Sequence, residues 1–148
     1  NLVIFVVDAS GSMAARDRLG GLSDQTVAAM VIMRAVYEHV LVESVGIGQS
    51  EADVAMVADT VVLCIQPGSG DSLQFMKAGV MELPDVIVVT KADMGPPAQR
   101  AKADVEGALT LVARDPGAWA APVVLVSSTT GEGLDALAAA IAAHRNWL

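Results

Sequence analysis

The sequence predicts an α/β fold, a three-layer, doubly wound sheet of about five mainly parallel strands with helices on both faces. Short runs rich in Val, Ile and Leu alternate along the chain with segments of helical period. This is the pattern of parallel strands joined by crossover helices. The runs are nearly continuous in hydrophobicity, as expected for strands buried on both faces. The chain has 148 residues, 53% of them hydrophobic, so we expect a single domain over residues 1–148.

Each expected element has its own local signal. Five apolar runs are the strand candidates: 2–7, 40–43, 60–65, 86–89 and 123–126. Five segments are the helix candidates: 23–36 with Ser23 as N-cap, 51–58, 71 to the residue before Pro84, 97–113 and 133–144. In a doubly wound sheet ligands bind at the carboxyl ends of the strands, so the loops that follow the strands are expected to carry the functional residues.

Composition and charge exclude several classes of function. The formal net charge of −8 argues against a nucleic-acid partner. The single cysteine, Cys64, excludes an intramolecular disulfide and fits a reducing compartment. No signal peptide or apolar run of membrane-spanning length is visible, so a cytoplasmic protein without a membrane partner is expected. His39 and His144 have no partner at metal-ligand spacing and are expected at the surface or at a helix end.

The loop after the first strand has the pattern of a metal site. Asp8, Ser10 and Ser12 stand at alternate positions directly after an apolar run. A carboxylate and two hydroxyls spaced in this way can bind one Mg²⁺ ion, with water and an external acidic ligand completing its shell. The alternative interpretation is a serine-rich turn that caps a helix. Both interpretations stay open from the residues alone.

Two loops further along could contact phosphate. Glu43 ends a predicted strand and can hold a magnesium-bound water, while Gly46 can offer its N–H to a γ-phosphate. The loop at 67–71 opens a predicted helix, whose N-terminus favours an anion. Glycines after strands are also common turn residues, so neither loop is specific by itself.

The last two loops resemble the guanine-recognition motifs of GTPases. T-K-A-D, Thr90 to Asp93, follows the fourth predicted strand and is close to N-K-x-D. S-S-T-T-G-E-G follows the fifth and resembles S-A-x-x-G-x-G. The resemblance implies that Asp93 accepts two hydrogen bonds from guanine N1 and N2 and that the Lys91 stem lies over the base. It also implies that Ser127 and Ser128 lie beside guanine O6.

Four stretches together resemble the methylmalonyl-CoA-mutase-associated GTPases, the MeaB or ArgK family: VLVESVGIGQSE, PGSGDSLQFMKAG, ELPDVIVVTKAD and SSTTGEGLDAL. The resemblance runs from about residue 19 to the C-terminus. It implies a P-loop GTPase-like, Rossmann-like fold, GTP or GDP with Mg²⁺ as ligands, and a cobalamin-dependent mutase as partner, with an oligomer possible. The site residues it implies are Glu43 and Gln49 for catalysis, and Gly46, Thr90, Lys91, Asp93, Ser127 and Ser128 for the nucleotide.

The chain departs from that family at its start. The family's phosphate loop, G-x-x-x-x-G-K-[ST], is absent from the sequence, whose only lysines are Lys77, Lys91 and Lys102. Residues 1–19 instead resemble the metal-ion-dependent adhesion site of von Willebrand factor A domains, as in the D subunit of magnesium chelatase. The chain is therefore interpreted as composite, 1–19 of one kind and 20–148 of the other, and as a GTPase-like domain with impaired hydrolysis. The alternatives are a Mg²⁺-dependent interaction module and a scaffold, natural or engineered, without activity.

Overall fold

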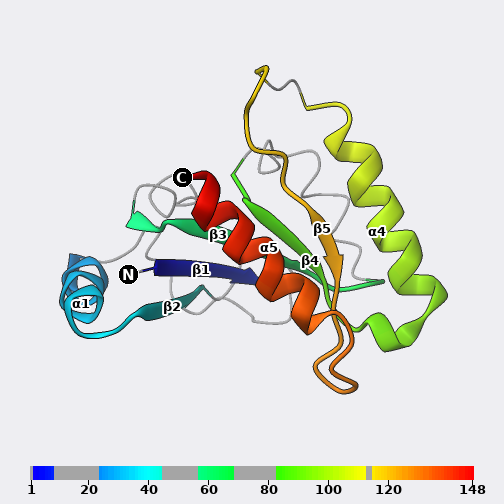
Figure 1. The fold of residues 1–148 in the computed structure, drawn as a ribbon. Helices are drawn as coiled ribbons and strands as arrows, with labels where there is room; N and C mark the ends of the chain where they lie inside the picture. Colours follow the sequence, from blue (N-terminus) through cyan, green and yellow to red (C-terminus); the bar gives the residue numbers. More distant parts are fainter. Residues whose placement is uncertain (1, 9–23, 45–56, 69–82, 113–114) are drawn as a thin grey trace.

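The computed structural model describes the chain except for residues 1, 9–23, 45–56, 69–82 and 113–114 (Figure 1). The elements are β1 (Leu2–Asp8), α1 (Asp24–Val36), β2 (His39–Ser44), β3 (Thr60–Ile65), β4 (Val86–Val89), η2 (Ala92–Met94), α4 (Pro96–Leu109), β5 (Val123–Leu125) and α5 (Leu134–Trp147). All five expected strands are present. The expected helices at 51–58 and 71–83 fall almost entirely outside the described residues.

The strands form one parallel sheet in the order β2-β1-β3-β4-β5. The chain passes from β1 to β2 on one side and then to β3 on the other, so the strand order reverses beside β1. This reversal confirms the doubly wound fold. Because all the strands are parallel, the loops that follow them meet at a single edge of the sheet.

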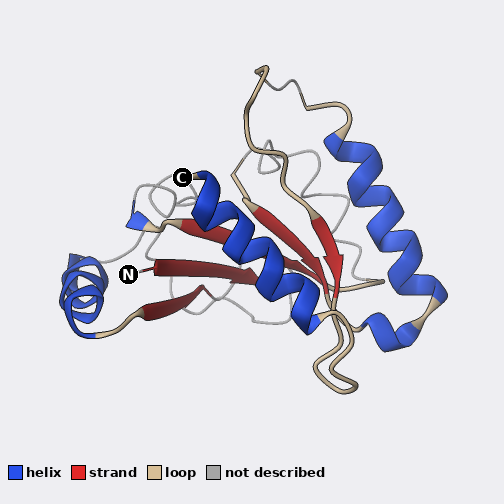
Figure 2. Ribbon diagram, viewed as in Figure 1, coloured by secondary structure: helices blue, strands red, loops and turns tan. Residues whose placement is uncertain are grey.

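Helices cover both faces of the sheet, as the nearly continuous apolar strands predict (Figure 2). On one face Val105 and Leu109 of α4 pack against Leu63 and Ile87 of the sheet. On the other face the apolar side of α5 packs against side chains of alternate register from β1, β3 and β4. The three-layer α/β fold is therefore confirmed, with the core in the layers above and below β3 and β4.

Several element ends differ from the sequence prediction by one or more residues. β5 ends at Leu125, one residue early. α4 begins at Pro96, because a proline is tolerated in the first turn of a helix, where its missing N–H would have no partner. It ends at Leu109, well before the expected residue 113, and the Thr110 hydroxyl then donates to the carbonyl oxygen of Gly107 at 2.6 Å. α5 continues past the expected end at His144 to Trp147.

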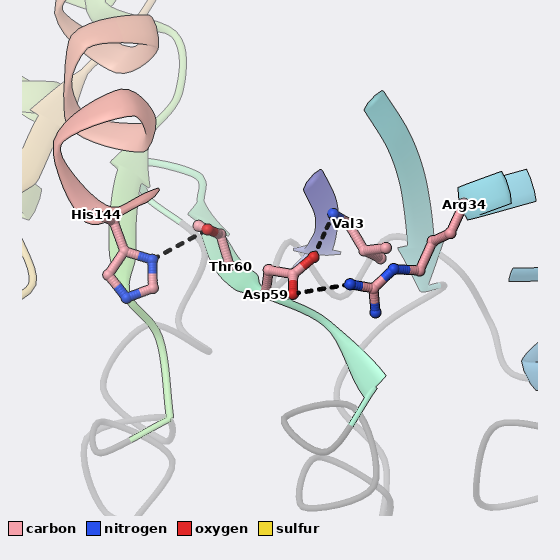
Figure 3. Close-up of polar contacts among 5 residues, drawn as sticks. All are labelled: Val3, Arg34, Asp59, Thr60 and His144. Atoms are coloured by element: carbon pink, nitrogen blue, oxygen red, sulfur yellow. Dashed lines mark hydrogen bonds and ion pairs between the residues drawn. The ribbon is translucent and has the colours of Figure 1, made fainter. Parts of the chain in front are cut away.

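At the amino-terminal edge of the sheet, polar groups join α1 and the first residues of the strands. The Asp59 carboxylate accepts from the Val3 N–H at 2.7 Å and pairs with Arg34 of α1 at 3.3 Å. On the opposite side of the chain, the Thr60 hydroxyl lies 3.0 Å from His144 Nδ1 (Figure 3). These contacts fix the start of β3 to β1, α1 and α5.

His144 lies in the last turn of α5, which agrees with the expected helix-end position, but it is not at the surface. Its side chain is 2% exposed, with Nε2 3.2 Å from Asp85 Oδ1. The indole N–H of Trp119 donates to the Asp85 carbonyl oxygen at 2.7 Å, and the His144 ring lies against the rings of Trp119 and Trp147. A buried imidazole needs partners for both nitrogens, and here Thr60 and Asp85 supply them.

The Asp85 carboxyl should titrate above its ordinary range. Burial raises its pKa above 3.8, and the Val61 N–H and the facing His144 counteract this only in part. As the pH falls, the Asp85 carboxyl therefore binds a proton at higher pH in the folded state than in the unfolded chain. The contribution of Asp85 to the free energy of unfolding is fully present below pH 3.8. That contribution is lost as the pH rises through the raised pKa. Carboxyl ¹³C NMR titration should give a midpoint above 3.8, and a midpoint at or below this value would contradict the expectation.

Among the helices that the structure describes, none combines the length and the hydrophobicity that a membrane span requires.

Candidate functional site

The carboxyl ends of β4 and β5 bring the T-K-A-D loop against the loop at 127–133. The Val126 N–H donates to the Val89 carbonyl oxygen at 2.9 Å, which continues the pairing of the two strands by one residue. The Ala92 N–H then donates to the Val126 carbonyl oxygen at 3.1 Å. Two segments more than 30 positions apart in the sequence thus form one structural unit at the sheet edge where the fold predicts ligands.

The T-K-A-D loop has a specific backbone path. Thr90 donates through both its N–H and its hydroxyl to the Ile65 carbonyl oxygen, at 2.9 and 3.2 Å. Lys91 then adopts the left-handed conformation, with φ 56° and ψ 45°. The chain turns directly into η2, which places Asp93 beside the neighbouring loop. This conformation costs an L-residue about 1–2 kcal/mol, so the surrounding contacts must stabilise the backbone of Lys91.

Asp93 and Ser127 are joined by a hydrogen bond. The Ser127 hydroxyl donates to Asp93 Oδ1 at 2.5 Å, and the serine side chain is fully buried. The same hydroxyl oxygen accepts from the N–H groups of Thr129 and Thr130, both at 3.2 Å. Ser127 therefore fixes both the Asp93 carboxylate and the turn that follows β5. Asp93 itself stays exposed, so its carboxylate can receive further donors.

The loop after β5 closes on itself and leaves one N–H available. The Ser127 N–H donates to the Glu132 carbonyl oxygen and the Gly131 N–H to the Ser127 carbonyl oxygen, each at 2.9 Å. The Glu132 N–H donates to the Thr130 hydroxyl oxygen. Within the described part of the molecule, the Ser128 N–H is the one amide between residues 127 and 132 that has no acceptor. A ligand acceptor placed beside Asp93 could therefore bind it.

Gly133 ends this loop in a conformation that only glycine fits. Its φ is +75°, and an added Cβ would lie 1.8 Å from the Leu125 carbonyl oxygen. The close approach lets α5 begin directly beneath the end of β5. The sequence pattern predicts Gly133 only at a helix start and carries no signal for its contact with a strand.

Replacement of Ser127 by alanine should lower the free energy of unfolding by about 1–3 kcal/mol, because it removes the buried partner of one carboxylate and two amides. Urea unfolding monitored by circular dichroism measures this change. Ser128→Ala is the matched control, since the Ser128 side chain is exposed and its loss should change stability by less than about 0.5 kcal/mol. Equal losses of stability in the two variants would contradict the structural role of Ser127.

The other predicted site residues are placed only in part. Glu43 lies near the end of β2 with an exposed side chain, and Asp8 ends β1 beside Cys64 of β3. Gly46, Gln49, Ser10 and Ser12 lie outside the described residues, and so does the Asp8 side chain. Among the residues that are described, no group of three or more His, Cys, Asp or Glu side chains could hold a metal ion. The described geometry thus offers no donor set with which to test Mg²⁺ binding.

A family model described as methylmalonyl-CoA mutase-associated GTPase MeaB matches residues 6–148. The match includes most of the segment 1–19, so the comparisons lend no support to a von Willebrand A-type origin of that segment or to a composite chain. A homologue from Caulobacter vibrioides is 40% identical over 129 residues, which is 86% of this chain and 40% of the homologue. The mouse "Methylmalonic aciduria type A homolog, mitochondrial" is 40% identical over 119 residues, 78% of this chain and 29% of that protein. The chain thus spans less than half the length of these relatives.

Solved structures with little sequence identity share the fold. The hydrogenase maturation factor HypB of Archaeoglobus fulgidus superposes with a TM-score of 0.67 at 13% identity, covering 93% of this chain and 86% of that one. HypB of Helicobacter pylori, solved in complex with nickel, gives a TM-score of 0.65 at 15% identity and covers 98% and 74%. At this level of identity the likeness supports the three-layer α/β architecture alone.

Proposed function

This chain belongs to the MeaB family of methylmalonyl-CoA mutase-associated GTPases, and on that basis we propose that it binds a guanine nucleotide through the two loops that follow β4 and β5. The observation that supports this most directly is the Asp93 carboxylate, exposed toward solvent and held by the buried Ser127 hydroxyl. A fixed carboxylate at the ligand edge of the sheet suits a base that presents two adjacent N–H donors. Guanine presents them at N1 and N2.

The backbone beside Asp93 complements the same base. Guanine carries an acceptor, O6, next to its N1–H. The Ser128 N–H is an unused donor on the residue that follows Ser127, whose hydroxyl holds the carboxylate. Adenine has an acceptor at N1 and no amino group at C2, so Asp93 would face a lone pair. A site built on such hydrogen bonds discriminates strongly, because the wrong ligand leaves its polar groups unpaired. In this proposal Lys91 covers the base and Thr90 belongs to the same loop.

Competition binding tests the proposal. A fluorescent guanine nucleotide would be displaced by GDP and by ADP in separate titrations, with Mg²⁺ present. GDP is expected to compete at least about 100-fold better than ADP. Equal competition by the two nucleotides would leave no guanine site in these loops.

We propose that hydrolysis by this 148-residue chain is impaired. Phosphoryl transfer depends on groups that position and neutralise the phosphates, and the lysine-bearing phosphate loop is absent from the sequence. In this proposal Gly46 would approach the γ-phosphate, Glu43 would stand near Mg²⁺, and Gln49 would be the second catalytic residue. Mg²⁺ bound with the nucleotide would neutralise the β and γ oxygens.

GTP turnover by the chain is expected to equal that of a buffer blank. Phosphate release from GTP and Mg²⁺ is the measurement, and the same assay without protein is the control. A rate of about 1 s⁻¹ or more, typical of a competent enzyme, would contradict the proposed impairment of hydrolysis. It would not contradict the proposed recognition of guanine.

The wider setting is also part of this proposal. We place residues 1–148 in one α/β domain of a cytoplasmic metallochaperone-type GTPase whose partner is a cobalamin-dependent mutase. The family membership supports it. Pull-down of a methylmalonyl-CoA mutase by the chain, with and without GDP, is the direct test of the partner.

A further inference from the structure

We propose that Thr90 is a positioning residue for base recognition, which it serves by tying the T-K-A-D loop to the end of β3. The proposal rests on the proposed guanine site. It also changes the role expected for Thr90, which the resemblance to GTPases groups with the nucleotide-contacting residues. Thr90 stands where the N-K-x-D motif has asparagine.

The two donors of Thr90 share one buried acceptor. Its N–H and its hydroxyl both donate to the carbonyl oxygen of Ile65, the last residue of β3 and 1% exposed. The N–H bond would form with any residue except proline, since it extends the pairing of β3 with β4. The hydroxyl bond depends on the side chain, and its acceptor is a backbone carbonyl oxygen of the neighbouring strand.

The next residue explains why this extra bond matters. Lys91 is the one non-glycine residue with positive φ in the described part of the chain. A strained residue persists only where contacts on both sides fix the backbone. Downstream, the Ala92 N–H is held by the Val126 carbonyl oxygen. Upstream, Thr90 is held by Ile65, so the left-handed turn is clamped between the ends of β3 and β5.

Asp93 directly follows Ala92, so the hydrogen bonds of Thr90 and Ala92 also fix the backbone position of Asp93. Two hydrogen bonds to a base require the carboxylate to be placed within a few tenths of an ångström. When the hydroxyl bond to Ile65 is lost, the loop samples other conformations. Returning the loop to the conformation that binds the base costs free energy, which weakens binding. The loss of one neutral hydrogen bond predicts GDP binding about 3–10-fold weaker.

The test compares Thr90→Val with Thr90→Ser. Valine keeps the branched shape and the backbone bond but lacks the hydroxyl, whereas serine keeps the hydroxyl. Thr110→Val is the matched control, because the Thr110 hydroxyl also donates to a backbone carbonyl oxygen but lies at the end of α4. For each variant we would measure the Kd for GDP, and the amide hydrogen exchange of Ala92 by NMR without nucleotide.

Thr90→Val should speed exchange of the Ala92 amide and weaken GDP binding, Thr90→Ser should restore both, and Thr110→Val should change neither. Weaker GDP binding with unchanged exchange would mean that Thr90 contacts the nucleotide directly, and it would overturn the positioning role. Failure of serine to restore both readouts would overturn it as well. If the unmodified chain does not bind GDP, the proposed function fails, and the exchange measurement still shows whether Thr90 holds the loop.

Discussion

Replacement of Gly133 by alanine is expected to lower the free energy of unfolding by about 3–5 kcal/mol, at the upper end of single-residue effects. The Cβ would stand 1.8 Å from the Leu125 carbonyl oxygen and 2.9 Å from the Leu125 carbonyl carbon, and both are backbone atoms of β5. Either the strand end or the start of α5 must move. Since the Asp93–Ser127 bond depends on the same loop, GDP binding should be lost together with stability. Urea unfolding followed by circular dichroism is the measurement.

Gly131→Ala separates the clash from the backbone conformation. Gly131 has φ +79°, close to that of Gly133, but an added Cβ would meet nothing within 4 Å. Alanine there should cost only the left-handed conformation, about 1–2 kcal/mol. If the two alanine variants lose equal stability, the close approach of Gly133 to β5 does not contribute to the free energy of unfolding, and the contact described between this loop and the end of β5 is wrong.

Asp93→Asn should reverse the base preference of the site. An asparagine amide presents a donor and an acceptor where the carboxylate presents two acceptors. Xanthine carries an oxygen at C2, which the amide can satisfy, whereas the guanine amino group would lose its acceptor. We expect the ratio of GDP to XDP affinity to fall by about 100-fold or more. Competition binding with GDP and XDP on both proteins measures it.

Asp104→Asn controls for the loss of one negative charge. Asp104 lies on the exposed surface of α4, away from the loop, and its replacement should leave both affinities unchanged. A drop in GDP affinity without a gain in XDP affinity in Asp93→Asn would show that Asp93 only caps the turn. Ser127 remains in both variants, so its hydroxyl can still bond the residue at position 93.

The fold could be predicted from sequence because its signals are local and repeated. The run at 86–89 is four apolar residues, and all four are buried in β4. Parallel strands buried on both faces have this continuous pattern, and it needs no knowledge of their neighbours. Helix ends were harder to predict. α4 stops at Leu109 although apolar residues continue beyond it, because end positions depend on capping and packing that periodicity does not report.

For the proposed site, the sequence predicts which segments take part but not how their side chains contact one another. T-K-A-D and the loop after β5 identify the segments, but the hydrogen bond between Ser127 and Asp93 joins positions 34 apart. Which serine of the pair faces the carboxylate depends on how the two loops meet. The burial of His144 could not be predicted for the same reason, since Thr60 and Asp85 are distant in sequence and become its partners only in the folded sheet. The roles expected for the phosphate and metal residues, Glu43 included, remain predictions.

The aromatic cluster around His144 determines what the protein's own fluorescence can report. Trp119 and Trp147 are the only tryptophans in the sequence, and both lie against the His144 ring. α5 leads from the loop at 127–133 to this cluster over 14 residues, a distance of about 20 Å. Indole emission should therefore follow the docking of the last turn of α5. It should respond little to a nucleotide at the opposite edge of the sheet, so an extrinsic or ligand-borne fluorophore is the appropriate probe for binding.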